Sequence, residues 1–87
     1  METRVAVMSI IVESADSVTE INELLHKYAA YIIGRMGIPY RAKNISIISI
    51  ALDAPQDITA MLSGQIGKLK DVSVKTAYSG IVSKCDE

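Results

Sequence analysis

Two uncharged runs dominate the hydrophobic pattern of this chain, at residues 5–12 and 45–52. Both are rich in Val and Ile, which are typical of β-strands. A strand with one face in water alternates apolar and polar residues, whereas these runs place Val, Ile, Met or Leu on both faces. The pattern therefore predicts a sheet that must be covered on both sides.

Two other segments have apolar residues at helical spacing. The first predicts a helix over about 17–30, with Ser17 and Glu20 as a capping box and a stripe of Val18, Ile21, Leu24, Leu25, Tyr28 and Ile32. The second starts near Asp53, which we expect to cap it with Gln56, and weakens at Gly64 and Gly67. Its apolar stripe comprises Ile58, Met61, Leu62, Ile66 and Leu69.

The remaining segments complete a six-element order. Residues 31–38 contain two glycines and are interpreted as a strand, followed by a polar loop over 38–44. Residues 71–78 alternate and predict the last strand, leaving a single domain over 1–80 and a tail over 81–87. The order strand-helix-strand-strand-helix-strand predicts an α+β, ferredoxin-like fold with a four-stranded antiparallel sheet and two helices on one face.

The helix-free face of such a sheet would be too apolar to remain exposed to solvent. A chain of 87 residues also builds only a modest core, for which oligomerisation is a common remedy. We therefore expect a homo-oligomer, a dimer or a tetramer. The residues expected at its interface are Val5, Val7, Ile11, Met36, Ile38, Ile47, Ile48 and Tyr78.

Composition narrows the function classes. A net charge of −1 argues against direct nucleic-acid binding, which usually needs a basic face. The apolar runs are shorter than the roughly 20 residues that span a bilayer, so no membrane association is expected. Cys85 is the only cysteine, which rules out an intramolecular disulfide and fits a cytoplasmic location.

No catalytic or metal-binding motif is present in the sequence. His26 is the only histidine, and no His or Cys pair has the spacing of a metal site. We expect no metal, no cofactor and no enzymatic activity, and we interpret Cys85 as an inert thiol. A small enzyme that uses His26 remains the weakest alternative.

Two segments are candidates for binding a small molecule. Arg35 and Tyr40 lie in the glycine-containing stretch 34–41, which could hold an anion or form a subunit contact. Glu13, Ser14 and Asp16 precede the first helix, where small polar groups either hold a ligand or cap the helix. The sequence leaves both alternatives open in each segment.

The chain resembles the small proteins grouped as regulators of the iron-only hydrogenase system. The resemblance rests on residues 4–7, 31–40, 45–49 and 72–78, of which 31–40 is the most specific segment. That family is similar to ACT-like domains and to the C-terminal domain of nickel-responsive repressors. The resemblance implies a ferredoxin-like fold that assembles through its sheets and a role in hydrogenase expression or maturation.

Three departures limit what the resemblance implies. The middle hairpin carries Pro39, Tyr40, Arg41 and Lys43 instead of the nickel-binding His and Cys. The chain starts directly at its first strand, without the repressors' DNA-binding segment. Residues 13–16 lack the glycine usual in amino-acid-binding ACT domains. We therefore expect a non-catalytic regulatory, ligand-sensing module that oligomerises through its sheet; the alternative is an accessory subunit that docks on a maturation enzyme or a DNA-binding protein.

Overall fold

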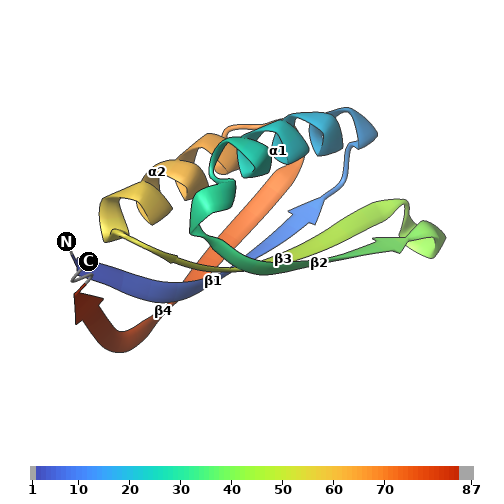
Figure 1. Ribbon diagram of the computed structural model, residues 1–87. Coiled ribbons are helices and arrows are strands. Elements are labelled where there is room, and N and C mark those ends of the chain that lie inside the picture. Colours follow the sequence, from blue (N-terminus) through green and yellow to red (C-terminus); the bar gives the residue numbers. More distant parts are fainter. Residues whose placement is uncertain (1, 85–87) are drawn as a thin grey trace.

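The predicted order of elements is confirmed by a computed structural model, which describes residues 2–84. It comprises β1 (Glu2–Val12), α1 (Ala15–Lys27), η1 (Ala29–Tyr31), β2 (Ile32–Tyr40), η2 (Arg41–Lys43), β3 (Ile45–Ala54), α2 (Gln56–Gly67) and β4 (Val72–Lys84), where η marks short 3-10 helices. All neighbouring strands are antiparallel, in the order β2-β3-β1-β4. Both helices lie on one side of the sheet (Figure 1). This is the ferredoxin-like arrangement.

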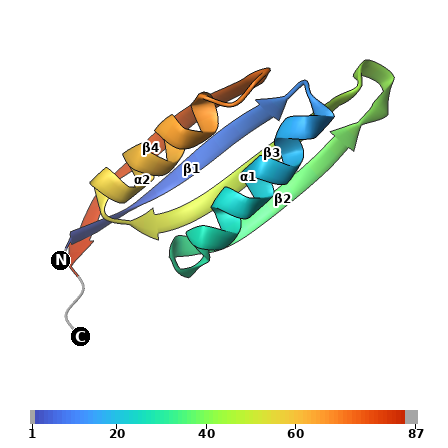
Figure 2. The same cartoon turned by 90° about the horizontal axis from the view of Figure 1, so that it is seen from above.

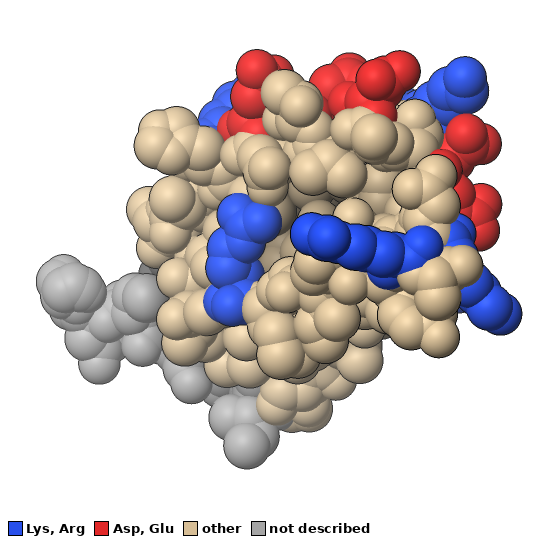
Figure 3. All heavy atoms as spheres, turned by 90° about the vertical axis from the view of Figure 1, so that its right-hand side faces the viewer, with Lys and Arg blue, Asp and Glu red and all other residues tan. Residues whose placement is uncertain are grey.

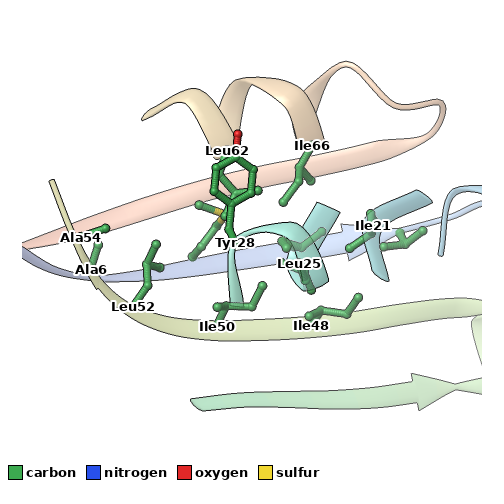
Figure 4. Packing of buried hydrophobic residues seen from close by; sticks show 13 residues of the cluster. Ala6, Ile21, Leu25, Tyr28, Ile48, Ile50, Leu52, Ala54, Leu62 and Ile66 are labelled. Carbon is green, nitrogen blue, oxygen red and sulfur yellow. The ribbon is translucent and has the colours of Figure 1, made fainter. Parts of the chain in front are cut away.

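The core lies between the sheet and the two helices. From Ala6 to Val12 every second residue of β1 is buried, and so are the residues opposite Ala6, Met8 and Ile10 in β3, as in the pairs Met8–Ile50 and Ile10–Ile48. Helix α1 contributes Ile21 and Leu25 to this layer, and α2 contributes Leu62 and Ile66 (Figure 4). Burying one such side chain stabilises the fold by about 1.5–3 kcal/mol.

The two helices cover the sheet unevenly. Seen from above, α2 lies over β1 and β4, whereas α1 lies over β3 beside β2 (Figure 2). Residues 33–40 of β2 are all exposed, although the strand pairs with β3 along most of its length. The sheet edge at β2 is therefore accessible from both faces.

The expected capping boxes are wrong. Helix α1 begins at Ala15, earlier than predicted, with Ser14 at the N-cap position and no side-chain cap. Ser17 is 1% exposed, and its hydroxyl donates a 2.7 Å hydrogen bond to the carbonyl oxygen of Lys70. A buried hydroxyl requires a partner, and here the partner lies in the loop before β4 and not in the Glu20 segment.

Asp53 does not cap the second helix, because β3 continues through Ala54. Pro55 occupies the N-cap position of α2 and makes no side-chain cap. Proline suits this boundary because its fixed φ and missing N–H cost little at the start of a helix.

Both outer strands extend further than the sequence predicted. β2 continues through Pro39 to Tyr40, so the expected loop shrinks to η2 and Asn44, which has a φ of 56°. Pro39 is tolerated because β2 is an edge strand. β4 continues to Lys84, which pairs with Glu2 after an irregularity in the register. Residues 81–84 of the expected tail therefore belong to the sheet, because β1 starts early enough to pair with them; 85–87 lie outside the described residues.

Candidate functional site

The helix-free face of the sheet, here called the open face, carries large apolar side chains on three strands. Their exposed fractions run from 37% to 58%, and the residues are Val5, Val7, Ile11, Met36, Ile38, Tyr40 and Ile47. The register brings several of them into one row, in which Ile38 pairs with Ile47 and Ile47 with Ile11. Directly opposite residues on antiparallel strands have Cβ atoms about 4.5–5.5 Å apart, so these side chains form a continuous apolar surface.

Few polar groups interrupt the open face. Ser9 and Ser49 face each other at its centre. Among the described residues up to 77, the register places only two charged side chains there, Asp53 on β3 and Lys75 on β4. Their charges are opposite, so the face carries no net charge.

Two of the predicted interface residues do not lie on the open face. Ile48 is 4% exposed and belongs to the core, because neighbouring strand residues point to opposite faces and Ile47 points outward. Tyr78 pairs with Ala6, whose side chain is buried beneath the helices, so the register places Tyr78 on the helix-covered side. For these two positions the predicted face is wrong.

A groove lies on the other side of the sheet, between α1 and the β2–β3 hairpin. It comprises one cavity of about 290 Å³ near the start of α1 and another of about 230 Å³ further along β2. Because Val18, Pro39 and Ser46 line both cavities, we describe them as one groove. Metabolite-sized ligands occupy pockets of this order or larger.

The charges along the groove are positive. Arg35 lines one cavity and donates a 3.0 Å hydrogen bond from its Nη2 atom to Oδ1 of Asn22. Arg41 lines the other cavity. No Asp or Glu among the described residues lines either cavity. Viewed from the hairpin end, acidic side chains gather on the helix side, whereas Lys and Arg lie across the middle of the molecule (Figure 3).

The structure brings together three of the five predicted ligand contacts. Ser14 and Tyr40 line the first cavity, and Arg35 lines the second. Glu13 and Asp16 are exposed and line neither cavity. The backbone N–H of Glu13 instead donates a 2.8 Å hydrogen bond to the carbonyl oxygen of Asp71, which ties the end of β1 to the loop before β4.

Sequence reasoning missed Asn22 and Asn44 as groove residues. Arg41 belongs to the stretch 34–41 for which an anion was considered, but it was not among the five predicted contacts. Asn22 lies one turn after Val18 on α1, but its neighbour across the groove depends on how the helix packs on the sheet. No sequence pattern specifies that packing.

His26 is exposed on α1, and residues 2–84 contain no group of three potential metal ligands. Cys85 lies outside the described residues. No helix within this range is long and apolar enough to cross a membrane.

Residues 4–76 match the model of the TM1266-like family, which is described as "Iron-only hydrogenase system regulator, putative". The chain is also similar to the solved structure of the uncharacterized protein TM1266 from Thermotoga maritima. The sequence identity is 34%, the match covers 87% of this chain and 96% of that chain, and the TM-score is 0.84. No curated protein matches the chain.

A more distant structural similarity concerns the fold alone. A formyltetrahydrofolate deformylase from Pseudomonas putida KT2440 matches with 10% identity and a TM-score of 0.63. The match covers 84% of this chain but 28% of the deformylase. The same fold therefore also occurs as a minor part of a larger protein.

Proposed function

The chain belongs to the TM1266-like family of iron-only hydrogenase system regulators, and from this premise we propose that it is a non-catalytic regulatory module that works as an assembly of identical copies. In this proposal the copies associate through the open face. A small molecule in the groove between α1 and the β2–β3 hairpin shifts the assembly, and the assembly state is the regulatory signal.

The observation that carries the proposal is the apolar open face. Contiguous exposed apolar patches beyond a few hundred Å² are rare on monomers and mark interaction sites. A second copy is a fitting occupant because the face is apolar and nearly uncharged, so two copies bring no net like charge together. A two-fold contact would use the same surface on both copies.

Shared residues support a link between the groove and the open face. Ile38, Tyr40 and Ile47 are exposed on the open face and also line the groove. A ligand in the groove and a second copy on the open face would therefore lie on opposite sides of the same three strand residues. A ligand shifts an equilibrium only by its difference in affinity for the two states, and shared residues provide such a difference.

Sedimentation velocity of the purified chain at micromolar concentration tests the assembly. We expect a dimer or larger species for the wild type, and a shift toward the 9.4 kDa monomer for Ile47→Lys, because the added charge would be buried without a partner. Ala60→Lys adds the same charge on the exposed side of α2 and should leave the assembly unchanged. Circular dichroism checks that both variants are folded.

A wild-type chain that sediments as a 9.4 kDa monomer up to about 100 μM would overturn the assembly proposal. The alternative is an accessory subunit whose open face docks on a different protein. It would be favoured if the monomer formed a stoichiometric complex with a maturation enzyme or a DNA-binding protein, and if Ile47→Lys abolished that complex.

A further inference from the structure

We infer that the groove between α1 and the β2–β3 hairpin binds a small organic anion, whose apolar body lies over Gly37 and whose anionic group lies at Arg41. The inference rests on the proposed function, since it specifies the ligand class for the same groove. It rests separately on the charges and shape of the groove, which do not depend on assembly.

The positive charge of the groove favours an anionic ligand. Arg35 and Arg41 are the charged residues among its described lining, and both are cations. Guanidinium groups bind carboxylates and phosphates through paired hydrogen bonds, so both groups are suitable ligands. A cationic ligand would meet two like charges and no carboxylate among the described residues that line the groove.

The two arginines are not equivalent. Arg35 already donates to Asn22, which holds its side chain across the groove toward α1. Arg41 makes no ion pair or side-chain hydrogen bond with any described residue, so its donors are available for a ligand. The N-terminal turn of α1 lies at the same end of the groove as Arg41 and adds positive partial charge there. Ser14, the N-cap residue, makes no side-chain cap. The anionic group is therefore placed at Arg41.

Gly37 leaves room for the apolar part of the ligand. It pairs with Ile48, whose side chain points toward the helices, so a side chain at Gly37 would point into the groove. A Cβ atom added at Gly37 meets no atom within 4 Å, and its φ is not in the left-handed region. The chain itself therefore gives no steric reason for glycine here. Val18 and Ile48 provide the neighbouring apolar surface.

Gly34 provides a matched control on the same strand. It pairs with Ala51 and therefore lies on the open face, and a Cβ atom added there also meets nothing within 4 Å. Gly37→Val should fill the groove, whereas Gly34→Val should add a side chain on the opposite face. Both variants should fold, because neither creates an intramolecular clash.

The test is an NMR titration of the full 15N-labelled chain with four probes. Hexanoate and monohexyl phosphate carry an apolar tail with a carboxylate or a phosphate, hexylammonium carries the same tail with a positive charge, and acetate lacks the tail. We expect saturable shifts of the Asn22, Gly37 and Asn44 amide signals with one or both hexyl anions. Comparing hexanoate with monohexyl phosphate identifies which anionic group, the carboxylate or the phosphate, is preferred. Hexylammonium should shift none of these signals, and acetate should bind at least tenfold more weakly.

The variants decide whether the binding uses the proposed residues. Gly37→Val and Arg41→Gln should each weaken hexyl-anion binding about tenfold or more, while Gly34→Val and Lys68→Gln should bind as the wild type does. The amide spectra report directly whether each variant is folded. Equal responses to hexanoate and hexylammonium, shifts confined to Val7 and Ser9 on the open face, or unchanged binding by Gly37→Val would each overturn the inference.

The outcome is distinguishable from a failure of the assembly proposal. Sedimentation without probe reports the assembly alone. A monomer that binds hexanoate in the groove would retain this inference and remove the sheet-mediated assembly. An assembled chain without saturable binding of either hexyl anion would retain the sheet-mediated assembly and remove this inference.

Discussion

Ser17 acts as a tether between two parts of the chain that are distant in the sequence. Its hydroxyl bonds the carbonyl oxygen of Lys70, 53 residues away, at the loop between α2 and β4. Together with the bond from Glu13 to Asp71, it fixes the start of α1 against that loop. The groove depends on this contact, because its wall is the first two turns of α1.

Ser17→Ala should therefore destabilise the fold by about 0.5–1.5 kcal/mol, since it removes the hydrogen bond that the buried Ser17 hydroxyl donates to the carbonyl oxygen of Lys70. Glu20→Ala should change the free energy of unfolding by less than about 0.5 kcal/mol, because Ser17 makes no capping box with Glu20. Urea denaturation at one fixed protein concentration measures both. Equal losses in the two variants would instead favour a capping box.

At the scale of elements, α2 contains two glycines with different surroundings. A Cβ atom added at Gly64 would meet no atom within 4 Å, whereas one at Gly67 would lie 3.3 Å from Cγ1 of Val74. Gly64 lies inside the helix and Gly67 is its last residue. Only the first position therefore combines open space with a helical backbone on both sides.

Gly64→Ala should stabilise the protein by about 0.5–1 kcal/mol, because alanine loses less backbone entropy than glycine when a helix forms. For a domain of this size, this corresponds to a rise in Tm of roughly 2–8 °C. Gly67→Ala should give a smaller rise or a fall, because Val74 must move. Thermal unfolding followed by circular dichroism measures both variants, and an equal rise in the two would contradict the close contact at Gly67.

The element boundaries show why part of the fold was predictable. The strand character of β1 follows directly from its Val- and Ile-rich sequence, as does the apolar stripe of α1. The ends of β2 and β4 were predicted too short, because their last residues are strands only through pairing with β3 and β1. Pro39 and the pair Ser79-Gly80 are typical of turns, but an available partner strand outweighed that tendency.

At the scale of the whole molecule, assembly and folding should be thermodynamically linked. If copies associate only when folded, Tm should rise with protein concentration, because unfolding then also requires dissociation. We expect this rise for the wild type and for Ala60→Lys but not for Ile47→Lys. Differential scanning fluorimetry over a hundredfold concentration range measures the effect, and a wild-type Tm independent of concentration would count against association through the open face.

The sequence by itself determined the fold and the apolar character of both sheet faces. These properties are set by local periodicity, since alternation in a strand and 3.6-residue spacing in a helix decide which side chains share a face. It also indicated Ser14, Arg35 and Tyr40 as ligand candidates. Their common location could not be derived, because it depends on where α1 crosses the sheet.

Only the tertiary structure decided which side chains share a site. Packing placed Arg41 and Asn22 along one groove, left Glu13 and Asp16 outside it, and buried Ile48 one residue away from exposed Ile47. The physical reason is that register and helix placement are set by contacts between residues far apart in the chain. Such contacts leave no periodic signal in the sequence.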